Sequence, residues 1–372
     1  MLKLRRGRVV EEDPLTVEIA GERRPAWADL GLVGEIRLGD EVVVNVEARD
    51  LGLGSGGFGL IHVNLTRGLE GAGPSGEHVM KLNYSSLQHP VRPVEGEIAT
   101  PPAAADASPT APATGSTART AAAGVPVLVL PLHGHLAPAA FAAAHAAAVP
   151  PDPADPTPAG GVRVGFIQAG GGALPGALSR DVSTLRKRGL LCGHITAGAS
   201  YGGEHEAISL PGAIEAAAGN LGWDLIIVGP GPGILGSATR LGHGGMAAMD
   251  AAHAALALGA DVVLAPRLSA TDPRGRHRGL SHHTATVLEL LLSPVTVPIP
   301  SSADAAGIEA EIDAVGGAHR HRVVPAAVDL VAYAAAGLPR RTMGRDLAQD
   351  PLFFAAPLAA GTVLATRRAP PS

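Results

Sequence analysis

The sequence has few aromatic residues, a single cysteine and almost no lysine. Phe, Trp and Tyr make up 3% of the 372 residues, so we expect a core that packs on Ala, Val, Leu and Ile. Cys192 has no second cysteine to pair with, which excludes an internal disulfide and fits a reducing compartment. Because only 3 of the 29 basic residues are lysines, a high arginine content says little about function, and only clusters of arginine are informative.

The chain also lacks a strong net charge, a secretory signal and a long apolar run. A net charge of -5 argues against bulk electrostatic binding to nucleic acid or to an anionic membrane. No apolar stretch follows the basic N-terminus, so no secretory signal is expected. The most apolar window, residues 125–149, contains three histidines and three prolines, which favours a strand and a helix over a membrane span. We therefore predict a cytoplasmic protein without membrane contact.

The N-terminal part of the chain has a different composition from the rest. Residues 1–98 contain short β-branched runs separated by turns, which predict a small β-rich domain, either a barrel or a sandwich. Its strands are expected at residues 8–12, 16–20, 35–38 and 41–48. Residues 99–124 consist almost entirely of Ala, Pro, Thr, Ser and Gly, a composition typical of a disordered linker.

From residue 125 onward, apolar strands alternate with helical patterns, so residues 125–372 are predicted to form an α/β domain with a short Pro-rich loop at 150–161. Alternation of this kind is typical of βαβ units, and predicts a mostly parallel, doubly wound sheet with helices on both faces. In such a sheet the loops after the carboxyl ends of the strands line the ligand crevice. Strands are expected at residues 125–130, 162–168, 190–196, 224–228, 261–265 and 295–299, and helices at 246–258 and 325–338.

A glycine-rich loop follows the predicted strand at residues 224–228. Residues 231–236 match the G-x-G-x-x-G pattern, but no acidic residue ends the next strand, and Pro230 and Pro232 remove two N–H groups that a phosphate would use. A dinucleotide site is therefore disfavoured. Backbone N–H groups of Gly229, Gly231 and Gly233 remain candidates for binding a polar ligand, and the alternative is a purely structural turn.

An Arg/His-rich segment, residues 267–284, follows the predicted strand at 261–265. It holds four arginines and three histidines against one acid, and guanidinium groups suit carboxylate or phosphate ligands. Its candidate ligand-binding residues are Arg267, Asp272, Arg276, His277, Arg278 and Ser281. Ser281 would cap a following helix, whose dipole should keep His282 or His283 neutral near pH 7 and able to transfer protons. The alternative is a solvated basic loop.

Further polar residues follow other predicted strands. His133 and His135 would direct both rings the same way if the chain stays extended, and Tyr201 and Glu204 precede His205, a third candidate for proton transfer. These five residues complete the candidate site. No ligand spacing here is diagnostic of a metal, so no metal ligand is assigned and the cofactor stays unknown.

Four segments together resemble one uncharacterised bacterial protein family, catalogued only as a domain of unknown function. They are residues 170–175, 197–206, 228–234 and 266–284. The resemblance covers nearly the whole chain apart from the two Pro/Ala-rich segments. It implies no established activity and no catalytic residues.

The sequence thus favours a protein that binds a small anionic molecule, phosphorylated or carboxylated, in the α/β crevice, with acid/base chemistry on that ligand as an extension. One alternative is a non-enzymatic sensor or regulatory module using the same pocket. Another is nucleic-acid binding by the N-terminal β domain, which its few aromatics and lack of a dense basic stripe disfavour. The sequence does not specify an oligomeric state.

Overall fold

The computed structural model describes residues 1–53, 56–71, 79–97, 120–146, 161–237, 239–301, 304–315 and 320–368. The chain divides into two compact units, residues 1–92 and 93–372, which are considered separately. Residues 99–119 of the predicted linker and 150–160 of the predicted Pro-rich loop lie outside the described residues. The last linker residues pack on the second unit, where Ala122 is fully buried and the Thr120 hydroxyl donates to the carbonyl of Leu258 at 2.6 Å.

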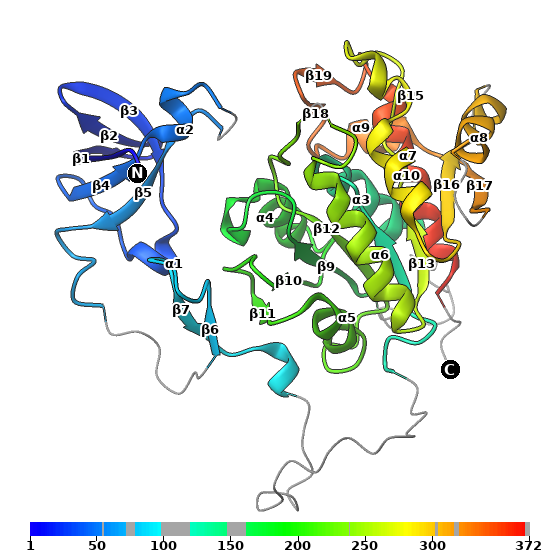
Figure 1. The fold of residues 1–372 in the computed structure, drawn as a ribbon, viewed down its shortest axis with the longest axis horizontal. Helices are drawn as coiled ribbons and strands as arrows, with labels where there is room; N and C mark the ends of the chain where they lie inside the picture. The colour runs from blue at the N-terminus through cyan, green and yellow to red at the C-terminus, as the bar shows by residue number, and fades with distance from the viewer. Residues whose placement is uncertain are drawn as a thin grey trace, which may run out of the picture. The chain divides into compact units, whose positions relative to one another are not determined.

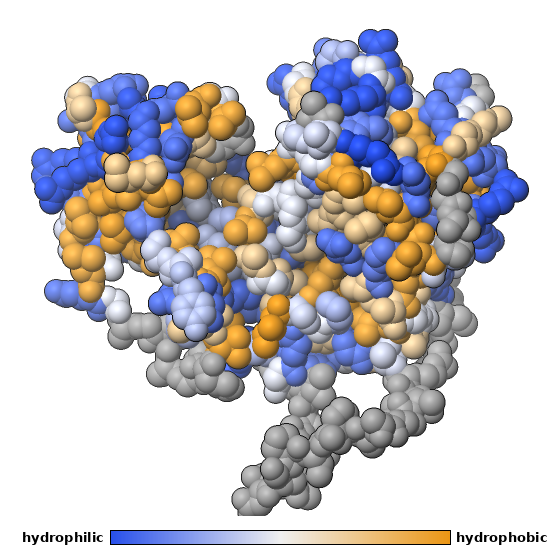
Figure 2. Space-filling model, in the orientation of Figure 1, coloured by the Kyte–Doolittle hydropathy of each residue, from blue (hydrophilic) through white to orange (hydrophobic). Residues whose placement is uncertain are grey.

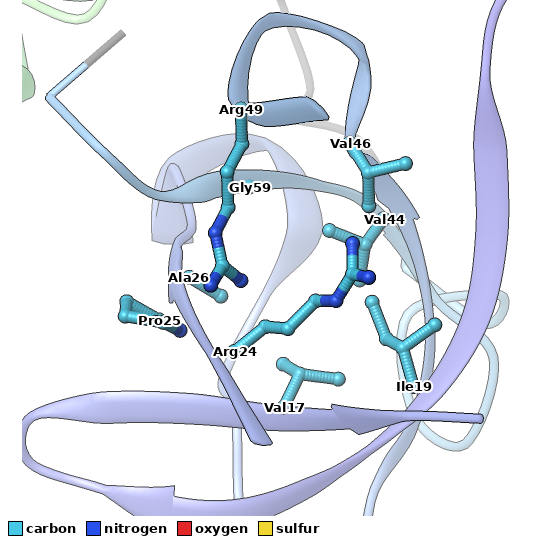
Figure 3. A pocket seen from close by; sticks show the side chains of 9 residues that line it. All are labelled: Val17, Ile19, Arg24, Pro25, Ala26, Val44, Val46, Arg49 and Gly59. Carbon is cyan, nitrogen blue, oxygen red and sulfur yellow. The ribbon is translucent and has the colours of Figure 1, made fainter. Parts of the chain in front are cut away.

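The first unit contains a closed five-stranded barrel in the order β1-β2-β3-β5-β4 (Figure 1). Only β3 and β5 pair in parallel. Its interior is built from valine and isoleucine, as the shortage of aromatics predicted. Figure 3 shows the side chain of Arg24 beside Val17, Ile19 and Val44, and that of Arg49 beside Ala26. The strands are β1 Leu4–Glu12, β2 Leu15–Ile19, β3 Glu22–Trp27, β4 Glu41–Asn45 and β5 Gly59–Asn64. Shorter elements are α1 Leu30–Val33, α2 Glu47–Asp50, β6 Val79–Lys81 and β7 His89–Val91.

The prediction of a strand at residues 35–38 is wrong. The buried carboxylate of Asp40 accepts a hydrogen bond from the backbone N–H of Arg37 at 2.8 Å, which folds this segment into a turn. Strand β3 was not predicted, because its charged residues and Pro25 give no β-branched run. Closure of the barrel supplies the pairing partners that such a strand needs.

The second unit contains an eight-stranded, all-parallel sheet in the order β11-β10-β9-β12-β8-β13-β16-β17. All six predicted strands are present, and two further strands, β11 and β17, form its edges. Strand β17 shows that the helix predicted from residue 325 begins too early, because Pro325 lies in this edge strand, where proline is tolerated. The strands are β8 Pro126–Val129, β9 Val164–Ala169, β10 Gly193–Ala197, β11 His205–Ala207, β12 Leu225–Pro230, β13 Asp261–Leu264, β16 Thr296–Pro300 and β17 Arg322–Ala326.

Helices cover both faces of this sheet, as predicted (Figure 1). Alternate residues of β8 point to opposite faces, so that Val127 and Leu128 belong to two different apolar clusters. One face packs on α5 Leu210–Ala218, α6 Ala247–Ala257, α7 His282–Leu290 and α8 Ala305–Asp313. The other packs on α3 Leu136–Ala146, α4 Arg180–Lys187, α9 Leu330–Ala335 and α10 Pro351–Thr366.

None of the helices in the described part of the chain is long and apolar enough to cross a membrane.

The strand order reverses between β9 and β12. The chain leaves β9 towards β10 on one side, and leaves β12 towards β13 on the other side. The carboxyl ends of two such neighbouring strands open the crevice that binds ligands in doubly wound sheets. The functional site is therefore sought among the loops that follow β9, β12 and their neighbours.

Candidate functional site

The glycine loops after β9 and β12 pack directly against each other. The backbone N–H of Ala173 donates to the carbonyl of Pro232 at 2.8 Å. A Cβ atom on Gly231 would lie 2.2 Å from the carbonyl oxygen of Ala173, and one on Gly229 would lie 3.0 Å from the Cβ of Leu130. Gly231 therefore allows the two loops to approach each other closely. Neither Gly229 nor Gly231 lines the cleft that opens beside these loops. Gly233 does line it, with a positive φ of 71°.

This cleft has a volume of about 390 Å³ and opens at the carboxyl ends of β8, β12 and β13. The short hairpin of β18 Arg341–Thr342 and β19 Arg345–Asp346 completes it. Its lining, among the residues that the structure describes, contains three arginines and three histidines but no aspartate or glutamate. Figure 2 shows hydrophilic residues gathered at this end of the unit, around β15. The lining residues are Leu132, His133, Gly134, Gly233, Ile234, Leu235, Gly236, Ser237, Arg267, Arg274, Arg276, His277, His283, Thr342 and Met343.

Asp272 lies behind the cleft lining and holds three guanidinium groups in place. Its fully buried carboxylate forms ion pairs with Arg267 at 3.3 Å, with Arg274 at 2.9 Å and with Arg345 at 3.1 Å. Burial by itself would raise the pKa of Asp272, but the hydrogen bonds and charge of Arg274, with the charge of Arg345, hold that pKa well below its usual range. A second buried carboxylate, Asp350, pairs with Arg345 at 3.2 Å. Asp272 thus orders these guanidinium groups and does not itself line the cleft.

Arg267 is 2% exposed, yet it lines the cleft. Burial, followed by the charge of Arg274, lowers the pKa of Arg267 to about 10, which still leaves the guanidinium protonated at neutral pH. Asp272 and Asp350 together cannot neutralise the guanidinium groups of Arg267, Arg274 and Arg345, so a positive charge remains at the cleft.

Arg276 and Arg278 were both predicted to bind the ligand, but they take different positions in the folded Arg/His segment. It folds through β14 Leu268–Ser269, a 3-10 turn at Gly275–His277 and β15 Gly279–Leu280. Arg276 lines the cleft and forms no ion pair among the described residues. Arg278 does not line the cleft, and its Nε donates to the backbone carbonyl of Asp272 at 2.9 Å.

Ser281 caps α7, as predicted, with its hydroxyl accepting from the backbone N–H of His283 at 3.3 Å. The same hydroxyl contacts Nδ1 of His277 at 2.7 Å. Burial, and then the charge of Arg267, lowers the pKa of His277 to about 3. Burial, and then His243 and Arg267, lowers the pKa of His283 to about 2. Both imidazoles are neutral at pH 7. For His283 this was predicted from the helix dipole, but burial is the larger cause.

His243 joins this cluster from the loop after β12 and was not among the predicted residues. Its ring stacks on His283 with centroids 3.8 Å apart, and its centroid lies 5.5 Å from that of His282. One ring nitrogen from each of His243, His282 and His283 lies within 4.8 Å of the other two. These three side chains are therefore the residues placed to hold a metal ion among those described.

The two histidines after β8 do not act together. Residues 133–135 form a 3-10 turn, so the expectation of an extended segment with both rings on one side is wrong. His133 lines the cleft, but its Nδ1 contacts the carbonyl of Pro230 at 3.0 Å and its Nε2 contacts the hydroxyl of Ser179 at 2.8 Å. His135 is buried with its ring 4.9 Å from that of Phe353.

Three predicted residues lie at the edge of the sheet instead of at the cleft. His205 begins β11, which is separated from β12 by two strands, or roughly 14 Å. Glu204 pairs with Arg186 on α4, and Tyr201 is buried, with its backbone bonded to that of Leu174 at 3.1 Å. None of the three lines the cleft, so the structure does not bring His205 together with His282 and His283.

Residues that the sequence did not indicate complete the site from distant segments. Arg345 and Asp350 follow the Arg/His segment by about 70 positions and join it through Asp272 and Ser269. Their only local signal is charge, which they share with the neighbouring Arg340, Arg341 and Asp346.

No curated protein and no solved structure matches the chain. A family model described as "Protein of unknown function (DUF3866)" matches residues 26–361, which include every residue that lines the cleft. Since this match covers nearly the whole chain, the protein belongs to that family, as the resemblance of its motifs implied.

Proposed function

We propose that this cytoplasmic protein binds a small anionic metabolite, phosphorylated or carboxylated, in the cleft of the α/β unit. The observation that supports the proposal is the excess of guanidinium groups over carboxylates. Three arginines and two aspartates form the connected ion-pair cluster, a net charge of +1, and Arg276 in the cleft lining raises the net charge to +2. Neither aspartate lines the cleft. A volume of about 390 Å³ suits a metabolite rather than a polymer.

Arg276 is the residue expected to contact the anion most directly. Arg267 and Arg274 already share Asp272, whereas Arg276 has no carboxylate partner among the described residues. A guanidinium group without a partner can form a bidentate contact with phosphate or carboxylate without breaking an existing ion pair.

Acid/base chemistry on the ligand would use the histidines of the cleft. His277 and His283 are neutral and buried beside Arg267, so each can form a hydrogen bond with a ligand. Their lowered pKa makes them weak bases, and a bound anion would raise that pKa by offsetting the charge of Arg267. A sensor would use the same contacts for binding alone. Turnover of the ligand separates these two roles.

Thermal unfolding in the presence of phosphate, sulfate and small carboxylates tests the proposal. At a ligand concentration of about 100 times Kd, binding stabilises the folded state by about 2.7 kcal/mol, which is about 5 to 10 °C in Tm for a unit of this size. Arg276→Ala should remove this gain, while Arg278→Ala, which deletes the same charge two residues away, should keep it. An equal response in the wild-type protein and in Arg276→Ala would place the anion site elsewhere.

A further inference from the structure

Three histidines from two separate segments meet with their ring nitrogens close together. His243 comes from the loop after β12, while His282 and His283 occupy the first turn of α7. One nitrogen from each ring lies within 4.8 Å of the other two. The ring centroids of His282 and His283 are 4.4 Å apart. The fold therefore brings two distant parts of the chain together at one small cluster of imidazoles.

The imidazole nitrogens of this cluster are buried without well-formed hydrogen bonds. His243 is 6% exposed, and neither Nδ1 nor Nε2 forms a well-aligned hydrogen bond among the described residues, although the backbone of Arg240 lies near the ring. The same holds for Nε2 of His282. Buried polar atoms in folded proteins are usually paired with protein, water or an ion. One ring binds a given ion through one nitrogen, so His243 and His282 each offer one such nitrogen to a common ligand.

We infer that His243, His282 and His283 bind a first-row transition metal ion, and we take Zn²⁺ as its probe. Neutral imidazole nitrogens suit zinc and its neighbours, whereas Ca²⁺ and Mg²⁺ require oxygen ligands. Three protein nitrogens leave a fourth position of a tetrahedral zinc site open, as in sites that act on a bound ligand. This inference stands apart from the proposed anion site, because metal binding is measurable without any anionic ligand.

The cluster lies between two clefts. His283 lines the arginine-rich cleft, while His243 lines a second cleft of about 360 Å³ formed by Gly170, Gly171, Gly198 and neighbouring residues. Since the rings of His243 and His283 stack on each other, the pair forms part of the wall between the two. A metal held there would be reachable from solvent and would lie beside the arginines of the first cleft.

Two contacts must change when the metal binds. Zinc–nitrogen bonds of about 2.0 Å in a tetrahedral site place the nitrogens about 3.3 Å apart. In this structure the three nitrogens lie within 4.8 Å of one another, so they must move closer together. The rings of His243 and His283 are nearly parallel, at 11°, so their lone pairs do not converge until one ring turns. The contact between Arg267 and Nδ1 of His283, 3.3 Å long, would be exchanged for the metal or for the other tautomer of the ring.

The test uses the full-length protein, stripped of metal with a chelator and titrated with Zn²⁺ against a chromophoric competitor. We expect one zinc per chain with sub-micromolar affinity. His243→Ala and His282→Ala should each weaken binding at least about 100-fold, since even residues behind the ligands change affinity 10- to 100-fold. His205→Ala on β11 is the matched control, and should bind as the wild-type protein does.

A second readout separates loss of the site from loss of the fold. Co²⁺ in place of Zn²⁺ should give visible d–d absorption in the wild-type protein and in His205→Ala, but not in the two site variants. Circular dichroism without metal establishes that these variants are folded, and His243→Gln and His282→Gln replace them if they are not. Failure of the wild-type protein to bind Zn²⁺ would overturn the inference, as would full affinity in folded His243 and His282 variants.

Discussion

Asp272→Asn is expected to destabilise the ligand-free protein and to strengthen anion binding at the same time. The carboxylate of Asp272 is fully buried and pairs with Arg267, Arg274 and Arg345. Asparagine keeps an oxygen that can accept from the backbone N–H of Arg274, a bond of 3.0 Å, but it removes the charge. Three guanidinium groups are then left to repel one another around a neutral amide.

The stability change follows from the burial of Asp272 and of its partner Arg267. Removing one member of a buried ion pair costs about 3 to 5 kcal/mol, and the retained hydrogen bond places Asp272→Asn near the lower value, about 3 kcal/mol. For a unit of this size, that corresponds to a fall of about 6 to 12 °C in Tm. Asp313→Asn is the control, because Asp313 pairs with Arg320 on the surface and its loss should cost no more than about 0.5 kcal/mol.

Anion binding should change in the opposite direction. A unit charge about 8 Å away, at an effective dielectric constant of about 20, contributes about 2 kcal/mol, and salt screening reduces this value. We therefore expect about tenfold tighter binding of sulfate to Asp272→Asn, seen as a larger rise of Tm with sulfate in differential scanning calorimetry. A variant as stable as Asp313→Asn, or one with a weaker sulfate response than the wild-type protein, would refute the electrostatic account of the cleft.

Three further outcomes are expected. Gly231→Ala should lower the free energy of unfolding by about 1 to 3 kcal/mol, because its Cβ would lie 2.2 Å from the carbonyl oxygen of Ala173, while Gly170→Ala, with no heavy atom within 4 Å of the new Cβ, should leave urea denaturation unchanged. In the barrel, burial would raise the pKa of Asp40, but hydrogen bonds led by that of Arg67 lower it, so this stabilisation is complete above about pH 4 and is lost as the pH falls through the folded-state pKa. Asp40→Asn should therefore be less stable than the wild-type protein at pH 7 and should lose less stability on acidification, which urea denaturation at several pH values measures; equal acid sensitivity of the two proteins would contradict this. Finally, the arginines repel a bare cation, so sulfate should tighten Zn²⁺ binding and Zn²⁺ should tighten sulfate binding by the same factor, which titration calorimetry measures in both orders; independent binding would show that the two sites do not interact.

The buried strands were predictable because each is a short apolar run bounded by turns. The edge strands were not, since β11 reads His-Glu-Ala and β17 contains Pro325, and both depend on a neighbouring strand for their conformation. Strand β3 of the barrel was not predicted for the same reason, because its conformation also depends on the neighbouring strands. Composition predicts a strand where burial requires apolar side chains, and says little where one side of the strand meets solvent.

Only the part of the candidate site that comes from one contiguous segment was predictable from the sequence. Residues 267–284 are contiguous, so their charge and the Ser281 cap could be identified from spacing alone. His243 and Arg345 are brought to this site by the tertiary fold, through contacts with His283 and Asp272. The residues next to them in the sequence do not indicate that they belong to the site. The role of Gly231 was likewise hidden, because the backbone it must approach belongs to a loop about 60 positions earlier.

The arginines of the cleft divide into two kinds, and this division argues for a ligand. Arg267 and Arg274 form ion pairs with the buried Asp272, so the fold itself accounts for their presence. Arg276 is exposed, lines the cleft, and has no ion pair among the described residues, so its charge adds repulsion to a cluster that is already positive. A residue that opposes folding electrostatically is explained if it contacts an anion, and Arg276→Ala should then raise the Tm of the ligand-free protein or leave it unchanged. A clear fall in that Tm would assign Arg276 a structural role and remove the main reason to regard the cleft as an anion site.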